Sequence, residues 1–429
     1  MREFVRMRDG QRLQGVKLLG AGGQGEVWEA QMDGRAVAVK IYHPHTTTSA
    51  QRDVLERLVD KGPPSTAFLW PLEFISDTAG PSMGYVMELR EKRFHAVEDF
   101  LTRRIVPSMK ALLTAAWQLA DAFLRLHSEG LCYRDISFAN VFFDPKNGDV
   151  RICDNDNVDI SGTVSGGILG TQRFMAPEVV RRGEAVPSDR TDRYSLAVLL
   201  FYMLLGGHPL DGEREARIRC LDLPALEKLY GFEPLYIFDP TDASNRPRAG
   251  IHDNVIAFEH HYPAPIREAF LRSFTTGLHY PDTRVKESEW RKVFRRAIDV
   301  ILPCSACDAD SFYDQDLLKA QGALICWSCP SKLTLPPRIR IGDDLVMLNR
   351  DTRLHGYHIG AVGDEAGPIA EVAVNPANPA LFGLRNLTSE SWTLTRPDGT
   401  NVPVPPGRAV PLVSGNRLNF GPVTGEIRV

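Results

Sequence analysis

The sequence predicts an α+β protein with a β-rich lobe, a helical lobe, a small cysteine-bearing segment and an all-β sandwich. Residues 12–90 alternate short apolar runs with glycine turns, and residues 91–300 show helical apolar periodicity. Residues 333–429 hold many short strand-like runs separated by Gly, Pro, Asn and Asp. Because 429 residues are too many for one compact core, we expect several domains.

Composition and charge narrow the class of protein. Hydrophobic residues make up 43% and charged residues 24% of the chain, as in ordinary globular proteins. The net charge of -4 does not favour a nucleic-acid partner or an anionic membrane. No apolar signal run follows Met1, and the longest apolar run, 196–205, is half of a bilayer span. We therefore expect a cytoplasmic protein that binds neither nucleic acid nor membrane.

The first lobe is predicted from four strand-like runs, "RLQGVKLLG", "GEVWEAQM", "GRAVAVKIY" and "MGYVMELRE". One helix is predicted among them in "TTTSAQRDVLERLVDKG", beginning at Thr48 or Ser49 and closed by Gly62. The second lobe is predicted from helical runs that include "SMKALLTAAWQLADAFLRLHSEG", "TDRYSLAVLLFYMLLGG" and "SEWRKVFRRAIDVIL". After "LPPRIRIG" the short strands begin, which favours a β-sandwich.

A glycine-rich stretch, "LGAGGQGEV", places Gly20, Gly22 and Gly25 in a G-x-G-x-x-G-x-V pattern. Glycines let a backbone run close to phosphates, although a simple glycine-rich hairpin is the alternative. A dinucleotide-binding fold would need a helix next, but strand-like alternation follows instead. Two strands bridged by a glycine flap, with "VAVK" ending at Lys40, resemble the nucleotide-covering lobe of protein kinases.

Further motifs carry the same resemblance in the family's order. "YRDISFAN" is similar to the kinase catalytic loop H-R-D-x-x-x-x-N, with Tyr133 in place of the histidine. "CDNDN" supplies Asp154 where the family has D-F-G, "GTQRFMAPE" matches A-P-E with Glu178, and "TDRYSLA" supplies a buried aspartate, Asp192. Arg284 in "DTRVKESEW" is expected to pair with Glu178. The resemblance implies a bilobal protein kinase fold over residues 12–300, with lobes at 12–90 and 91–300.

The resemblance also implies the roles of the catalytic residues, since positioning and charge neutralisation dominate phosphoryl transfer. Lys40 would hold the α- and β-phosphates of ATP, and Asp135 would accept the proton of the attacking hydroxyl. Asn140 and Asp154 would hold Mg²⁺ (or Mn²⁺), which prefers oxygen ligands. The partner of Lys40 should be a carboxylate on the intervening helix, which indicates Glu56, the only glutamate between Lys40 and Glu73.

The same register predicts the remaining nucleotide contacts. Met87 would close the back of the adenine pocket, and Glu88 with Arg90 would supply hinge contacts. The full set of predicted nucleotide-binding residues is Gly20, Gly22, Gly25, Val27, Ala38, Lys40, Met87, Glu88, Arg90, Asn140 and Asp154.

Besides Tyr133, three residues depart from the family pattern. Serine/threonine kinases usually carry lysine two residues after the catalytic aspartate, where this chain has Ser137. Asn155 and Asp156 replace the Phe-Gly of D-F-G, and the extra carboxylate could disturb or join the metal site. The preferred hypothesis is still an active kinase. The rival hypothesis is a pseudokinase scaffold that binds nucleotide weakly and acts through its C-terminal domains.

The activation segment indicates the substrate class. Thr171 occupies the position typical of serine/threonine kinases, and the full A-P-E segment disfavours a small-molecule phosphotransferase. Arg134, before the catalytic aspartate, suggests control by a phosphorylated loop. Ser161, Thr163 and Ser165 are candidate phosphorylation sites, with an ordinary flexible loop as the alternative.

Four of the seven cysteines form two C-x-x-C pairs, Cys304 with Cys307 and Cys326 with Cys329, separated by eighteen residues. This spacing predicts a zinc ribbon over residues 301–332 in which four thiolates hold a structural Zn²⁺. A redox role for either pair is the alternative.

The tail, residues 333–429, resembles a forkhead-associated β-sandwich in stretches such as "LHGYHIG" and "AVPLVSGNRLNFG". Phosphothreonine-binding members have Arg where this chain has Ala361, and we find no Ser-x-x-His stretch. The resemblance therefore implies binding of unmodified protein, or packing on the kinase. The overall combination looks bacterial. It is similar to kinases that act on protein substrates beside a partner phosphatase and a von Willebrand A-type protein.

Overall fold

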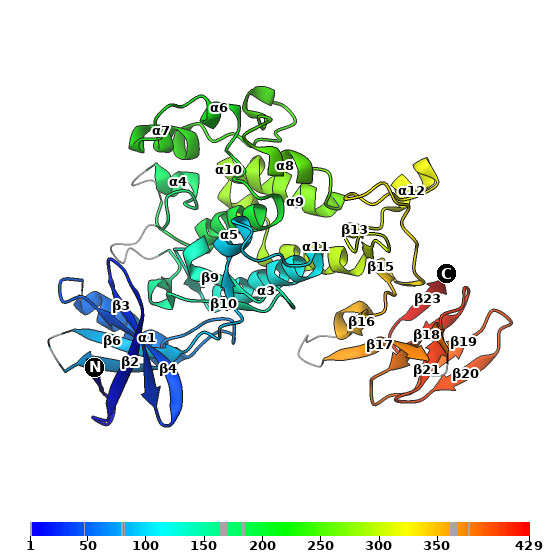
Figure 1. Cartoon of the computed structure of the whole chain (residues 1–429), viewed down its shortest axis with the longest axis horizontal. Coiled ribbons are helices and arrows are strands. Elements are labelled where there is room, and N and C mark those ends of the chain that lie inside the picture. Colours follow the sequence, from blue (N-terminus) through cyan, green and yellow to red (C-terminus); the bar gives the residue numbers. More distant parts are fainter. Residues whose placement is uncertain are drawn as a thin grey trace. The chain divides into compact units, whose positions relative to one another are not determined.

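Six strands at the start of the computed structural model close into a barrel in the order β1-β2-β3-β4-β6-β5 (Figure 1). Their bounds are β1 (Arg2–Arg6), β2 (Arg12–Ala21), β3 (Gly25–Met32), β4 (Arg35–Tyr42), β5 (Glu73–Asp77) and β6 (Met83–Glu88). All neighbouring strands pair antiparallel, as in a β-meander with one exchanged pair. The strand β1 lies before the predicted start of the lobe at residue 12, and its Phe4 is fully buried in the barrel core.

The structure describes residues 2–46, 48–78, 80, 82–162, 170–181, 185–360, 367–375 and 378–429. The chain divides into two units, Met1–Phe294 and Arg295–Val429, and each is described by itself. Within the described residues, no helix is both long enough and apolar enough to cross a membrane.

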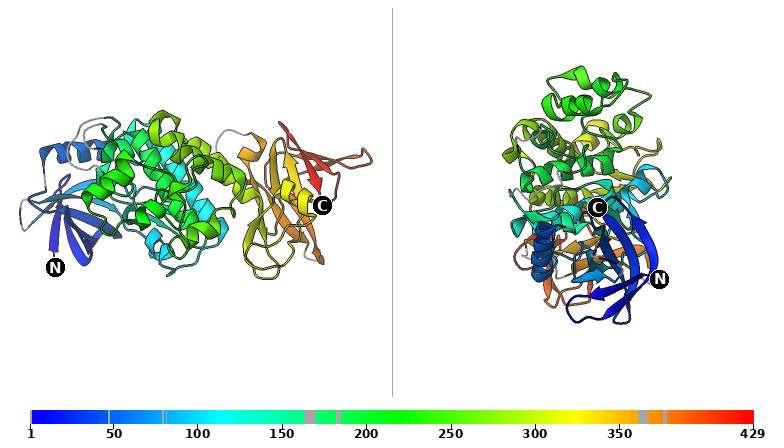
Figure 2. Two further views of the ribbon diagram at one scale, coloured as in Figure 1. Left: turned by 90° about the horizontal axis from the view of Figure 1, so that it is seen from above. Right: turned by 90° about the vertical axis from the view of Figure 1, so that its left-hand side faces the viewer.

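The helix α1 (Ser49–Lys61) lies against the barrel, as Figure 2 shows. The Thr48 side chain caps its first turn by accepting the backbone N–H of Gln51, and Gly62 ends it with a φ of 75°. Both predicted ends of this helix are confirmed. Leu55 and Leu58 face the core one turn apart, which fixes the other side of the helix towards solvent.

The helical lobe is built around the long buried helix α5, which is capped at both ends. Ser188 forms a capping box with Thr191, and Gly206 ends the helix with a φ of 70°. The bounds of the larger helices are α3 (Met109–Ser128), α5 (Asp189–Leu205), α8 (Asp253–Phe258), α9 (Ala264–Phe274) and α11 (Glu287–Asp299). The shorter helices are α2 (Val97–Leu101), α4 (Pro177–Val180), α6 (Glu213–Ala216), α7 (Leu223–Glu227) and α10 (Thr276–His279).

Short strands and 3₁₀ turns carry the polar loops of this lobe. They are β7 (His95–Ala96), β8 (Leu131–Cys132), β9 (Val141–Phe143), β10 (Val150–Ile152) and β11 (Asp159–Ile160), with 3₁₀ turns η1 (Phe138–Asn140) and η2 (Asn155–Asn157). The antiparallel pair β9–β10 places the ends of η1 and η2 side by side, because η1 precedes β9 and η2 follows β10.

The second unit begins with a small two-knuckle segment. The hairpin of β12 (Ile301–Pro303) and β13 (Asp310–Phe312) is followed by α12 (Gln315–Gln321) and by a bridge between Ile325 and Lys332. Leu302 and Leu324 of this segment form a small core with Met347, which belongs to the following β15 (Asp344–Met347).

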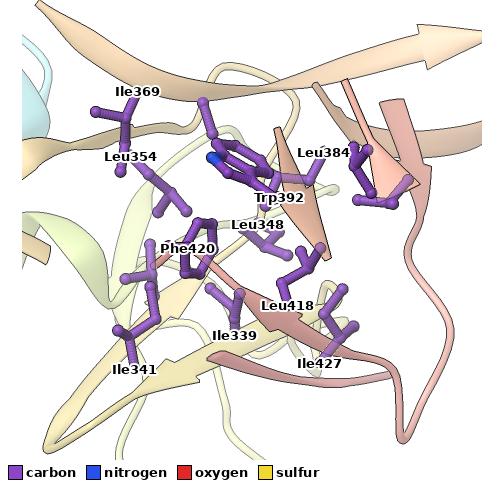
Figure 3. Close-up of a cluster of buried hydrophobic side chains, with 14 of the residues drawn as sticks. Ile339, Ile341, Leu348, Leu354, Ile369, Leu384, Trp392, Leu418, Phe420 and Ile427 are labelled. Atoms are coloured by element: carbon purple, nitrogen blue, oxygen red, sulfur yellow. The ribbon is translucent and has the colours of Figure 1, made fainter. Parts of the chain in front are cut away.

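Two antiparallel sheets follow, in the orders β15-β14-β23-β22-β19-β20 and β16-β17-β18-β21. Their strands are β14 (Arg338–Ile341), β15 (Asp344–Met347), β16 (Arg353–His355), β17 (Pro368–Asn375), β18 (Asn378–Asn386), β19 (Trp392–Thr395), β20 (Asn401–Val404), β21 (Ala409–Pro411), β22 (Arg417–Asn419) and β23 (Thr424–Arg428). Side chains from both sheets, among them Leu354, Trp392 and Ile427, meet in one apolar core (Figure 3). The prediction of C-terminal β-sheets is confirmed.

Candidate active site

The predicted catalytic residues come from elements of both lobes. Lys40 lies on β4 of the barrel, whereas Asp135 and Asn140 lie on the loop through η1 and Asp154 caps η2. The β9–β10 pair brings the two loops together, since the backbone N–H of Cys153 donates to the carbonyl oxygen of Asn140 at 2.9 Å.

Lys40 is buried and surrounded by acceptors from the D-N-D-N turn. Its Nζ lies 2.8 and 3.0 Å from the two carboxylate oxygens of Asp156 and 3.5 Å from Oδ1 of Asp154. The side chain of Gln24, in the glycine-rich loop, lies at 3.5 Å. The lysine therefore joins the glycine loop to the turn that carries Asp154.

The expected partner of Lys40, Glu56, is not in this cluster. Glu56 is half exposed and pairs with Arg52 one turn away on the same helix, at 3.2 Å. The reason is the helical period, because Leu55 and Leu58 take the buried face of α1 and Glu56 follows Leu55 onto the outer side. The structure therefore does not bring Glu56 to Lys40 as predicted, and the lysine contacts the carboxylate of Asp156 instead.

Asp156 is the centre of a buried polar network. Its carboxylate accepts hydrogen bonds from the hydroxyls of Tyr42 and Tyr85, the second at 3.0 Å, as well as from Lys40. Burial alone would raise the pKa of Asp156, but the charge of Lys40 and these hydrogen bonds outweigh it and lower the pKa. Burial likewise works to lower the pKa of Lys40, and the charges of Asp156 and Asp154 raise it instead. The pair is thus a charged one.

Hydrogen bonds of Asp192, Asn140 and Thr171 hold the catalytic loop in place. The buried carboxylate of Asp192 accepts the backbone N–H groups of Tyr133 and Arg134, the second at 2.9 Å. Asn140 Nδ2 donates to the carbonyl oxygen of Asp135 at 2.8 Å and to its carboxylate at 3.2 Å. The hydroxyl of Thr171 donates to the other oxygen of Asp135 at 2.7 Å. Thr171 thus links the activation segment to the candidate proton acceptor.

The negative charge at this site exceeds the positive charge. Burial raises the pKa of Asp154; Lys40 opposes the shift, and the charges of Asp156 and Asp135 add to it. The carboxylates of Asp154 and Asp135, together with the amide oxygen of Asn140, form an oxygen-rich donor set that suits Mg²⁺. The residues present therefore fit the predicted metal.

The glycine-rich loop has room for a ligand on one side only. At Gly20 and Gly22, no described atom lies within 4 Å of the place that a Cβ would take. A Cβ at Gly25 would instead meet the carbonyl oxygen of Ile41 at 2.2 Å. The structure thus explains Gly25 by the close approach of β3 and β4, and leaves space at Gly20 and Gly22 within the described residues.

The predicted adenine side is apolar and continuous. Ala38 is the direct neighbour of Met87 across β4 and β6, and both are buried with Val27 packed against the same cluster. Glu88 ends β6, and the Arg90 guanidinium stacks over the ring of Phe142 at 3.9 Å. Sequence analysis missed Phe142, although its position two residues after Asn140 on a buried strand was the available signal.

The guanidinium of Arg134 forms an ion pair with the buried carboxylate of Asp159. The carboxylate of Asp159 also lies 3.4 Å from Arg57 of α1.

Of the candidate phosphorylation sites, Thr163 and Ser165 lie outside the described residues, while Ser161 exchanges hydrogen bonds with Asp189. The predicted pair of Arg284 with Glu178 is confirmed as a bidentate contact of 2.7 and 2.8 Å.

A second candidate site lies in the C-terminal unit. The four sulfur atoms of Cys304, Cys307, Cys326 and Cys329 lie within 4.8 Å of one another, with two contacts of 3.7 Å. A tetrahedral Zn²⁺ with bonds of about 2.3 Å would place its ligands about 3.8 Å apart. Backbone N–H groups of Ala306 and Ser328 approach the first cysteine of each knuckle at 3.4 Å. The cluster therefore fits a four-thiolate metal site.

Comparisons with known proteins agree with this geometry. The protein kinase domain family matches residues 13–247, which is more than half of the chain. The serine/threonine-protein kinase pkn2 of Myxococcus xanthus is 28% identical over 304 residues, covering 63% of this chain and 34% of the relative. PknL of Mycobacterium tuberculosis is 38% identical over 144 residues, covering 33% of this chain and 35% of the relative.

A further relative is the DNA damage-responsive serine/threonine-protein kinase RqkA of Deinococcus radiodurans, which is 27% identical over 225 residues, covering 47% of this chain and 31% of the relative. The chain spans about a third of the length of each of these three relatives. The chain belongs to the protein kinase family. The three relatives above are serine/threonine-protein kinases, so the predicted class is confirmed.

Proposed function

We propose that the chain transfers the γ-phosphate of ATP to serine or threonine hydroxyls of a protein substrate. The observation that carries this proposal is the convergence of Lys40, Asp135, Asn140 and Asp154, with Thr171 bonded to Asp135. Lys40 would bind phosphate oxygens and Asp135 would accept the proton of the attacking hydroxyl. Asn140 and Asp154 would hold Mg²⁺, which neutralises phosphate charge when it is bound.

The nucleotide would be framed by the residues around the two open glycines. Gly20 and Gly22 offer the uncrowded backbone, while Val27, Ala38 and Met87 offer an apolar surface for the base. Glu88 and Arg90 would serve as hinge contacts. Phe142 joins this set because it lies beneath Arg90.

The kinase proposal is tested by transfer of radiolabel from ATP to the chain itself and to a generic basic protein. Loss of the proton acceptor in Asp135→Asn should lower incorporation by roughly 10²- to 10⁴-fold. Nucleotide affinity and thermal stability, measured on the same sample, should change little. Equal incorporation with the wild type and with Asp135→Asn would overturn the proposal.

One observation favours the rival pseudokinase. Ser137 stands where the family has a lysine, and Lys40 is already paired with Asp156. Nucleotide binding without any transfer above the level of Asp135→Asn would support the scaffold instead.

For the second unit we propose a structural Zn²⁺ held by Cys304, Cys307, Cys326 and Cys329, followed by a protein-binding β-sandwich similar to a forkhead-associated domain. The four-sulfur cluster supports the first part, and the two packed sheets support the second. Ala361, which bears on phosphothreonine recognition, lies outside the described residues. A phosphatase and a von Willebrand A-type protein are the partners that the resemblance suggests.

A further inference from the structure

We propose that Asp156 is the positioning residue for Lys40, in the place that a carboxylate on the N-lobe helix holds in the kinase family. The inference rests on the proposed function, because it concerns the lysine that would bind the phosphates. It assigns a role to the residue that replaces the glycine of D-F-G.

The first support is the number of contacts that converge on this carboxylate. Lys40 and Tyr42 come from β4, and Tyr85 stands directly opposite Lys40 on β6. All three donate to Asp156, with distances of 2.8 Å from Lys40 and 3.0 Å from Tyr85. Three donors from two adjacent strands fix the position of the carboxylate.

The second support is the anchoring of the turn that presents Asp156. Asn155, which stands where the family has phenylalanine, is fully buried, and its amide donates to the carbonyl oxygens of Leu69 at 2.8 Å and Ile152 at 3.0 Å. Asp154 adopts a left-handed conformation with a φ of 52° at the start of the turn. The buried hydrogen bonds of Asn155 therefore anchor the turn between Asp154 and Asp156.

The third support is the chemistry of α1. Its buried positions Leu55 and Leu58 are apolar, and Gln51, whose side chain lies near enough to influence Tyr42, is neutral. Glu56 is turned to solvent. In the described structure, both carboxylates in contact with Lys40 thus come from the η2 turn, and orientation of the lysine does not depend on a movement of α1.

The test compares kcat and the KM for ATP across a set of variants. Asp156→Asn and Asp156→Gly should lower kcat by about 100-fold, because the lysine loses its fixed geometry. The double variant Gln51→Glu with Asp156→Gly moves the carboxylate onto α1 and should recover part of kcat. Glu56→Gln, and the matched surface control Asp53→Asn, should stay within about twofold of the wild type.

Two outcomes would overturn the inference while leaving the proposed function intact. One is full or increased kcat in a folded Asp156 variant, which would mean that Asp156 blocks Lys40. The other is a loss of about 100-fold in Glu56→Gln, a surface variant that should fold whatever the Asp156 variants do. Failure of the proposed function looks different, since the wild type would then be no more active than Asp135→Asn.

Discussion

At Gly25, β3 runs so close to β4 that a side chain has no room, and this separates two kinds of glycine in one loop. The carbonyl oxygen of Ile41 would lie 2.2 Å from an added Cβ, and that atom belongs to the backbone, which cannot turn away. At Gly20 the same place is open within the described structure. One glycine is required by packing and the other is available to a ligand.

We therefore expect Gly25→Ala to destabilise the kinase unit by about 1–3 kcal/mol through overpacking. Gly20→Ala, its control in the same loop, should leave the unfolding midpoint unchanged and raise the KM for ATP. Urea unfolding and steady-state kinetics measure the two effects. A Gly25→Ala protein as stable as the wild type would show that the β3–β4 approach is looser than the structure indicates.

The identity of the lysine's partner shows what sequence could not predict at this scale. Counting glutamates between Lys40 and Glu73 selects Glu56, but the count ignores the helix face on which that residue lies. Leu55 and Leu58 reveal the buried face, and Glu56 stands about 100° away from Leu55. Asp156 was noticed as an extra carboxylate, yet its pairing depends on strands β4 and β6 meeting the η2 turn, which is a tertiary contact.

At the scale of elements, one histidine joins three helices of the larger lobe. His127 near the end of α3 contacts Asp192 of α5 at 3.0 Å and Glu287 of α11 at 2.7 Å. Burial works to lower the pKa of His127, but the hydrogen bonds and charges of the two carboxylates raise the pKa to about 9. The same loop-supporting Asp192 therefore carries a buried cation on its other side.

This contact predicts a specific pH dependence of stability. The folded pKa of His127 lies above its unfolded value of about 6.5, so its stabilisation is complete below that pH and is lost as the pH rises towards about 9. Between pH 6.5 and 8.5 the contribution of His127 to the free energy of unfolding should fall by about 2 kcal/mol. His208 and His261, whose pKa values are lowered by burial, oppose part of the net fall. Urea unfolding at several pH values measures this fall.

His127→Gln should remove most of the slope, whereas His260→Gln, at an exposed position, should keep it. A wild-type protein with constant stability over this pH range would contradict the buried, charged histidine.

Local sequence signals predicted the helices and strands themselves better than they predicted which of these elements pair in space. Thr48 and Gly62 mark the ends of α1 because capping depends on adjacent residues only, and the structure confirms both. The five-residue strand β1 was missed because "REFVR" has too few residues for alternation to stand out. It becomes a strand by pairing with β2 and with β5, which lies some seventy residues away.

At the scale of the whole molecule, the motifs along the chain predicted the kinase unit because the family's chemistry is spread over many matching stretches. The sequence of the C-terminal unit predicted less of its topology. Its short strand-like runs indicate sheets, but they do not indicate which strands become neighbours. For example, β14 pairs with β23, at the far end of the chain. The cysteine spacing, by contrast, predicted a local cluster that the structure contains.

The two cores of the C-terminal unit give the zinc proposal a sharp consequence. The cysteines stand beside the small cluster of Leu302, Leu324 and Met347, whereas the β-sandwich has a separate and larger core that includes Trp392. A small core is where a metal contributes most to folding. Purified protein should contain about one Zn²⁺ per chain, and Cys307→Ser should lower this content while Cys220→Ser, at an exposed cysteine outside the cluster, should not.

Removal of the metal by a chelator should then raise amide hydrogen exchange in residues 301–333. The sandwich strands other than β15, which contributes Met347 to the small core, should stay protected, because their core does not include the cysteines. Hydrogen exchange read by mass spectrometry distinguishes the two segments in the full chain. Unchanged exchange in residues 301–333 after complete loss of metal would mean that the four thiols hold the ribbon without an ion. Loss of protection in both segments would instead mean that the sandwich depends on the ribbon, and that the two cores form one cooperative unit.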